Sequence, residues 1–253
     1  MTGQHASVLF ELRRGVLIVT LNNPRAGNVI DDDMADGLRE GCRRAIETEE
    51  CSVVLLTAAG TVFSHGAAPL SDPFTEMPRR RVAAAVGAIA KPVIAAIPGD
   101  AIGQGLELAL ACDLRLAADS ANFAMDQVSH GQVPWDGGTQ RLPRLLPRGL
   151  AMEMVLAGRS LTAQDALQAG LVLECVPSTD LPARALALAE TLARMAPIAA
   201  AYAKEAILKG ADLPLEHGSR LEADLAVLLQ STGDRSEGIR SFLEKRRPKF
   251  TGA

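Results

Sequence analysis

The segment that decides the fold runs from Lys91 to Asp113 and reads KPVIAAIPGDAIGQGLELALACD. Its first part, Val93–Ile97, is short, apolar and bounded by turn residues, which is typical of a buried strand. The Gly-Gln-Gly sequence at 103–105 allows close backbone approach before an apolar helix with one acid, Glu107. Such a helix directs unpaired N–H groups and a partial positive charge at the preceding loop. The segment predicts an anion-stabilising turn beside a carboxylate, unless Glu107 is only a favourable first-turn acid.

Similar short apolar runs recur along the first two thirds of the chain and alternate with helical patterns. This alternation indicates an α/β fold with layered sheets and helices. We predict further strands at 8–12, 16–21, 53–57, 114–117 and 172–176, and helices at 33–47 and 104–112.

The chain changes character near residue 160. The stretch SLTAQDALQAG predicts a short helix with Thr162 as its N-cap, Asp165 completing a capping box and Gly170 as its end. From residue 180 onward the pattern is almost entirely helical. We predict that residues 1–195 form the core and that residues 196–253 form a helical oligomerisation region. The predicted segments of this last part are helices at 180–195, 197–210, 221–229 and 235–245, and an irregular basic tail at 246–253.

Composition excludes several classes of protein. Of 253 residues, 48% are hydrophobic and 22% charged, as in ordinary globular proteins. A net charge of −4 and an aromatic content of 3% argue against a nucleic-acid or membrane partner. The four cysteines are scattered without metal-ligand spacing, so no metal site or disulfide framework is expected. The N-terminus lacks a signal-peptide pattern, which leads us to expect a cytoplasmic protein.

A second glycine-containing loop, GTVFSHGAAPL at 60–70, follows the predicted strand at 53–57. Two loops that follow neighbouring parallel strands can direct backbone N–H groups at one point. Two converging amides form an oxyanion hole, which stabilises charge on a carbonyl or thioester oxygen.

With these loops the chain resembles the crotonase (enoyl-CoA hydratase/isomerase) superfamily nearly from end to end. The resemblance implies a spiral of ββα repeats, a C-terminal helical trimerisation region and a homotrimer or dimer of trimers. It also implies an acyl-CoA thioester substrate and no cofactor besides the coenzyme A that the substrate carries. Six stretches in the family's order support it: LNNPRAGNVI, FSHGAAPL, KPVIAAIPGDAIGQGLELALACD, PWDGGTQRLPR, AGRSLTAQDALQAGLV and FLEKRRPKF.

The resemblance places the two oxyanion-hole amides on Ala67 and Gln104. Arg25 could pair with a phosphate of coenzyme A or be a plain surface residue. The positions implied for binding coenzyme A and the substrate are Arg25, Ala26, Ala67, Ala68, Pro69 and Leu70.

One position departs from the hydratase pattern, in which two glutamates flank a water. Glu107 matches the first glutamate, but the second position is Gln127, which does not ionise at neutral pH. Asp136 could replace the missing acid as a catalytic group, or it could cap the helix that begins near Gly137. Asp126 is expected to face away from Gln127 by strand alternation.

The resemblance therefore implies an acyl-CoA hydro-lyase that adds water to a 2-enoyl-CoA, with a cyclic dienoyl-CoA as a specialised version. The alternatives are an enoyl- or dienoyl-CoA double-bond isomerase and a non-catalytic binder of CoA thioesters. His65, His130 and Trp135 are the remaining candidates and are expected to line the acyl pocket.

Overall fold

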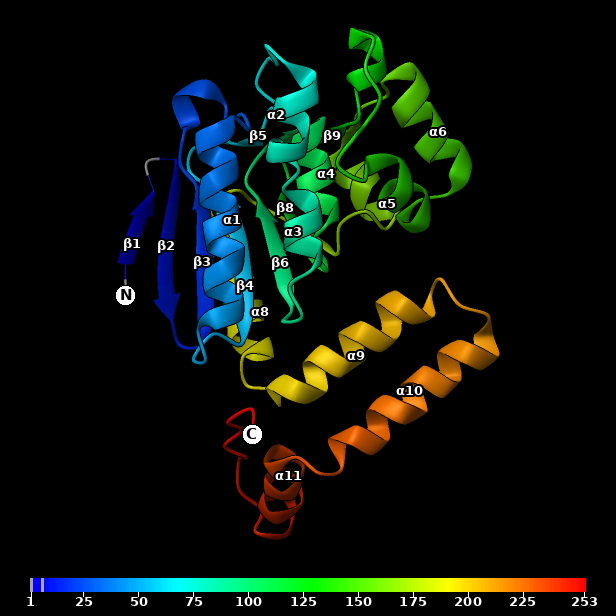
Figure 1. Ribbon diagram of the computed structural model, residues 1–253. Coiled ribbons are helices and arrows are strands. Elements are labelled where there is room, and N and C mark those ends of the chain that lie inside the picture. The colour runs from blue at the N-terminus through cyan, green and yellow to red at the C-terminus, as the bar shows by residue number, and fades with distance from the viewer. Residues whose placement is uncertain (1, 6) are drawn as a thin grey trace.

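The computed structural model describes residues 2–5 and 7–253, and places side chains from Ser7 onward. Its larger sheet has the strand order β1-β2-β3-β4-β6-β8-β11 (Figure 1). The strands of this sheet are β1 (Thr2–His5), β2 (Val8–Arg13), β3 (Val16–Leu21), β4 (Val53–Ala58), β6 (Val93–Ile97), β8 (Leu114–Ala118) and β11 (Glu174–Val176). The predicted strands are confirmed to within a residue at each end, except that the last one begins at Glu174 instead of Val172.

The larger sheet is parallel from β3 to β11, while β1, β2 and β3 pair antiparallel. Its central strands are apolar on both faces because helices cover both. In β4, Val54 and Leu56 join one hydrophobic core, and Val53 and Leu55 join the other. The alternation in a single strand therefore connects the two cores of the protein.

A smaller sheet with strand order β10-β9-β7-β5 lies beside the first. One strand of each sheet and a following helix make a repeating ββα unit, seen in β4–β5–α2 and β6–β7–α4. This is the predicted spiral, but the small strands were missed because two or three residues carry no periodic signal. They are β5 (Val62–Ser64), β7 (Asp100–Ile102), β9 (Asn122–Ala124) and β10 (Leu161–Thr162).

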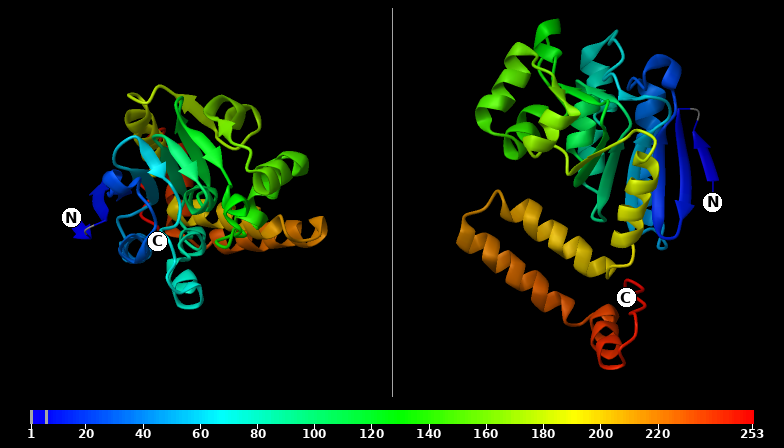
Figure 2. Two further views of the ribbon diagram at one scale, coloured as in Figure 1. Left: turned by 90° about the horizontal axis from the view of Figure 1, so that it is seen from above. Right: turned by 180° about the vertical axis from the view of Figure 1, so that it is seen from behind.

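Helices cover the sheets on both sides. Helix α8 covers the far face of the larger sheet, as the view from behind in Figure 2 shows. Its Leu181, Ala185 and Ala189 pack into the second core. The predicted capping box of α7 is confirmed, with Thr162 and Asp165 bonded reciprocally. The helices of this part are α1 (Asp32–Glu47), α2 (Pro73–Arg80), α3 (Ala83–Gly87), α4 (Gln104–Leu110), α5 (Gly138–Leu145), α6 (Arg148–Ala157), α7 (Ala163–Gln168) and α8 (Leu181–Leu192), with 3-10 turns η1 (Pro24–Ala26) and η2 (Gln127–His130).

The C-terminal helices α9 (Pro197–Gly210), α10 (Leu215–Leu229) and α11 (Gly233–Leu243) extend away from the sheets (Figures 1 and 2). Helix α10 begins earlier than the predicted 221, because Pro214 occupies its N-cap position. No residue of α9 is fully buried, and Lys204 ties it to the body through an ion pair of 2.7 Å with Asp113. Exposed large apolar side chains on these helices and their connection are Ile207, Leu208, Leu213, Leu215, Val227, Leu228, Ile239, Phe242 and Leu243.

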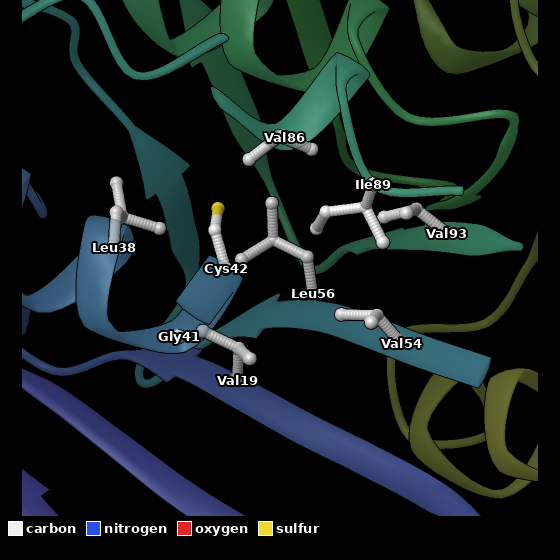
Figure 3. Close-up of a pocket in the computed structure, with 9 residues that line it drawn as sticks. All are labelled: Val19, Leu38, Gly41, Cys42, Val54, Leu56, Val86, Ile89 and Val93. Atoms are coloured by element: carbon white, nitrogen blue, oxygen red, sulfur yellow. The ribbon is translucent and has the colours of Figure 1, made fainter. Parts of the chain in front are cut away.

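A small void lies inside the main core, between α1, α3 and the larger sheet (Figure 3). Its volume is about 10 Å³, so it has no room for a substrate. The one polar atom that points toward it is the Cys42 thiol, and burial raises the pKa of this thiol to about 11. The void is therefore a packing defect lined by Val19, Leu38, Gly41, Cys42, Val54, Leu56, Val86, Ile89 and Val93.

Candidate active site

A pocket of about 330 Å³ opens where the 60–70 loop, the start of α4 and η2 meet. This is the place where the sequence predicts an oxyanion hole. The pocket is lined by His65, Gly66, Ala67, Ala68, Pro69, Leu70, Gly103, Gln104, Asp126, Gln127, His130, Gln132 and Trp135.

Both predicted oxyanion residues line this pocket. Ile30 donates its N–H to Gly66 O at 2.7 Å, and Ala68 donates to Ile30 O at 3.1 Å. In such a parallel bridge the amide of the intervening residue, Ala67, points away from the partner strand. Gln104 is the first residue of α4, so its N–H has no acceptor within the helix. The two amides can therefore receive an anion.

Glycines bring the two loops together. Gly66 has φ +91°, and a Cβ there would lie 3.3 Å from Gln104 N. Gly105 is tighter still, since an added Cβ would lie 2.5 Å from Ser64 O. A side chain at either position would push the first loop away from α4, so close approach of the amides depends on these residues.

Glu107 lies behind the wall of the pocket and is fully buried. Its Oε1 accepts hydrogen bonds from Asp136 N at 2.8 Å and Gly138 N at 2.7 Å. Its Oε2 accepts one from Gln127 Nε2 at 3.1 Å. Burial raises the pKa of Glu107, against the opposing effect of the backbone donors. A raised pKa favours the protonated form more than in an ordinary glutamate.

Gln127 stands between Glu107 and the pocket. Its Nε2 holds Glu107, while its Oε1 is buried without a partner among the described residues. A rotation of this one side chain would connect Glu107 with the pocket. Gln127 is thus the residue of the pocket lining that contacts Glu107.

Asp136 is also fully removed from solvent and does not line the pocket. Its Oδ2 accepts from Val82 N at 2.8 Å, Ala83 N at 2.9 Å and Gln104 Nε2 at 3.1 Å. The alternative that Asp136 caps the helix starting near Gly137 is wrong, because α5 has no side-chain cap. The carboxylate instead binds the start of α3, across the fold.

Asp126 corrects a sequence expectation. Strand alternation predicts that it faces away from Gln127, yet both residues line the pocket. The reason is that β9 ends at Ala124 and the chain turns into η2 at Gln127, so the two-residue period stops before Asp126. No sequence signal marked Asp126 or Gln132 as pocket residues.

Arg80 is a supporting residue that the sequence analysis did not identify. Its guanidinium is buried, pairs with Asp32 at 2.8 Å and donates to Ala68 O at 3.2 Å. Its own carbonyl accepts from Gln104 Nε2 at 2.5 Å. Arg80 therefore ties the first oxyanion loop to the start of α4.

The remaining predicted residues divide into two groups. His65, His130 and Trp135 line the pocket, and so do Ala68, Pro69 and Leu70. Arg25 and Ala26 lie outside the lining and are exposed in η1. Gly27, which follows Ala26, packs against the pocket lining: a Cβ built on Gly27 would lie 2.5 Å from Nδ1 of the lining residue His65.

In the part of the chain that the structure describes, no group of three or more His, Cys, Asp or Glu side chains is placed to hold a metal ion. Within the same residues, no helix has the length and apolar character needed to cross a membrane.

Comparisons with known proteins find relatives that match nearly the whole chain. The 2,3-dehydroadipyl-CoA hydratase of Escherichia coli is 37% identical over 98% of this chain and 99% of its own length. The (E)-benzylidenesuccinyl-CoA hydratase of Thauera aromatica is 39% identical over 97% of this chain and 99% of its own. The crystal structure of an enoyl-CoA hydratase from Bacillus anthracis superposes with a TM-score of 0.92 at 35% identity, covering 98% of this chain and 100% of that one.

The family model for enoyl-CoA hydratase/isomerase matches residues 11–253. Nearly the whole chain is therefore accounted for by one family, which confirms both the crotonase-type fold and the expectation of an enzyme. The chain belongs to the enoyl-CoA hydratase/isomerase family.

Proposed function

We propose that this enzyme adds water to the double bond of a 2-enoyl-CoA thioester. The observation that carries the proposal is the meeting of two free amides, on Ala67 and Gln104, in a pocket next to Glu107. The hydratases found among its relatives support the same reaction class.

The amides act on the thioester oxygen. When the oxygen of water bonds to the β-carbon, the electrons of the double bond move toward the thioester and negative charge collects on its oxygen. Amides held at Ala67 and Gln104 stabilise this enolate without having to reorient, an effect of roughly 3–4 kcal/mol for one donor.

Glu107 supplies the proton for the α-carbon. It is the buried acid nearest the pocket, and its raised pKa keeps a larger share of it protonated. Donation requires the Gln127 side chain to rotate, or a water to replace its carboxamide. Gln127 itself can hydrogen-bond to water or to Glu107, but its carboxamide neither gains nor loses a proton at neutral pH.

The coenzyme A part of the substrate extends from the oxyanion hole toward the 60–70 loop. In this proposal Ala67, Ala68, Pro69 and Leu70 contact it, with Arg25 and Ala26 of η1 at its nucleotide end. Arg80 supports this path by holding the carbonyls of Ala68 and Pro69 at 3.2 and 3.3 Å.

The test is a panel of linear and cyclic 2-enoyl-CoA esters, including 2,3-dehydroadipyl-CoA and benzylidenesuccinyl-CoA, with products read by mass spectrometry. A gain of one water identifies the hydratase. Binding of the panel without any change in mass or spectrum would mean a CoA-thioester binder and would overturn the proposal.

A second candidate function is double-bond isomerisation, favoured by Gln127 in place of the second glutamate. One carboxyl group suffices for this reaction, because Glu107 can remove a proton from one carbon and return it to another. An unchanged mass with a shifted absorption spectrum on a 3-enoyl-CoA would identify it.

We further propose that the chain forms a homotrimer or a dimer of trimers through α9, α10 and α11. The exposed apolar side chains of these helices need a partner surface, as large apolar patches usually do. Light scattering at micromolar concentration tests this, and a monomer would contradict it. In the trimer, Ile207→Asp on α9 should favour dissociation, while Glu222→Gln on the exposed side of α10 serves as the control.

A further inference from the structure

The pocket contains a carboxyl group that the hydratase pattern does not assign. Asp126 precedes Gln127 and lines the pocket together with Gly103, Gln104 and Trp135. Glu107 and Asp136, by contrast, are outside the lining. Asp126 is therefore the one carboxylate among the described lining residues that reaches the pocket directly.

The position of Asp126 relative to the oxyanion hole follows from Gly103. A Cβ built on Gly103 would lie 3.3 Å from Asp126 Oδ1 and 3.7 Å from Gln127 Nε2. Gly103 immediately precedes the amide of Gln104. Asp126 and the Gln127 carboxamide thus meet beside the same loop, at the end of the pocket where the thioester oxygen is proposed to bind.

The carboxylate of Asp126 is also free to act. No hydrogen bond from the described residues reaches it, and its side chain is 34% exposed. Its titratable neighbour on the same turn is His130, whose Nδ1 lies 3.9 Å from Oδ2. The other titratable groups around it are His65, which lines the same pocket, and Glu107, which lies behind Gln127.

The proposed hydration leaves one proton without an acceptor. Water must lose a proton as its oxygen bonds to the β-carbon, and Gln127 cannot accept it. Glu107 has its own task, because it donates a proton to the α-carbon.

We propose that Asp126 is the catalytic base that takes the proton from the attacking water. The oxygen–carbon bond forms at the β-carbon as the O–H bond of water breaks, and its proton passes to the Asp126 carboxylate. The π electrons move onto the thioester oxygen and return to form the C–H bond at the α-carbon with the proton of Glu107. Asp126 then releases its proton and Glu107 regains one through solvent, so the net change is the addition of one water. This assignment rests on the hydratase function proposed above.

Two reactions distinguish the proposed role of Asp126 from that of Glu107. Hydration of crotonyl-CoA needs both groups, whereas exchange of the α-proton of butanoyl-CoA in D2O needs the oxyanion hole and Glu107 alone. Asp126→Asn should lower hydration by roughly 100-fold or more, the usual scale of general base catalysis, and should leave α-proton exchange within about threefold of wild type. Asp126→Glu should restore part of the hydration.

Asp119→Asn is the matched control, because Asp119 is exposed at the end of β8 and outside the pocket. It should leave both reactions unchanged. The melting temperature of Asp126→Asn should match wild type, since the side chain makes no hydrogen bond that the substitution would break.

Hydration by Asp126→Asn at the wild-type rate would overturn the role of Asp126 and leave the hydratase function standing. Loss of hydration and exchange together would also overturn it, because a base specific to water is not needed for exchange. A wild-type chain that hydrates no 2-enoyl-CoA would overturn the proposed function and this assignment with it.

Discussion

Helix α4 and the turn η2 both bring polar side chains to the pocket, but the protein holds them very differently. Every residue of α4, from Gln104 to Leu110, is buried, and Glu107 receives three hydrogen bonds. In η2 only Gln127 is buried, and the side-chain carboxylate of Asp126 just before it receives no hydrogen bond from the described residues. One carboxyl group is therefore held in place by hydrogen bonds and has its pKa raised by burial, while the other is partly exposed to solvent at the pocket.

The largest effect is expected from removing the buried acid. Glu107→Gln should lower turnover by roughly 100-fold or more, because the α-carbon loses its proton donor. Folding should survive, since the Gln oxygen can still accept from Asp136 N and Gly138 N. The measurement is kcat and KM on the substrate found in the panel, and full activity would remove Glu107 from the mechanism.

A smaller effect is expected at Asp136, which binds three donors without facing the pocket. Asp136→Leu should lower the free energy of unfolding by about 2–3 kcal/mol, because Val82 N, Ala83 N and Gln104 Nε2 lose their acceptor.

Asp136→Asn keeps an acceptor oxygen and is the matched control. It should retain most of the stability and turnover, as measured by urea unfolding and kcat. A loss of activity comparable to that of Glu107→Gln, with unchanged stability, would instead show that the charge of Asp136 takes part in the reaction.

Gly105 of α4 packs closely against the 60–70 loop, so a larger side chain at this position should lower the stability of the fold. Gly105→Ala should cost about 1–3 kcal/mol, since the new Cβ would lie 2.5 Å from Ser64 O and backbone must move. Thermal unfolding measures this, and Gly149→Ala in α6 is the control for added volume, because nothing lies within 4 Å of its added Cβ and its φ is not positive. An unchanged melting temperature for Gly105→Ala would contradict the tight approach of the two loops.

The smallest expected effect is a pH dependence of stability. Burial raises the pKa of Glu107 above its ordinary 4.5, so the folded chain holds this proton more tightly than the unfolded chain does. The stability that Glu107 contributes is complete below its unfolded pKa and is lost as the pH rises through the raised folded pKa. As the pH rises above about 4, the free energy of unfolding of wild type should therefore fall relative to that of Glu107→Gln. The difference should level off above the folded-state pKa of Glu107, as measured by urea unfolding at each pH. A constant difference would mean that the pKa of Glu107 is not raised.

Most of the larger sheet was predictable because β2, β3, β4, β6 and β8 are long enough to show apolar runs between turn residues, as in Val93–Ile97. The second sheet was not, because strands such as Asp100–Ile102 are too short to carry a period. The loop containing Ala67 and the start of α4 were predictable from their glycines, and the structure brings them together at one pocket.

For the polar residues, the local sequence determined identity but not surroundings. Residue type alone established that Glu107 can exchange a proton and that Gln127 cannot, because this depends only on the side-chain group. Only the tertiary structure decided that Asp136 binds the start of α3 and that Asp126 opens to the pocket. Burial and hydrogen-bond partners come from chain segments far apart in sequence, such as Val82 and Asp136, so no local pattern encodes them.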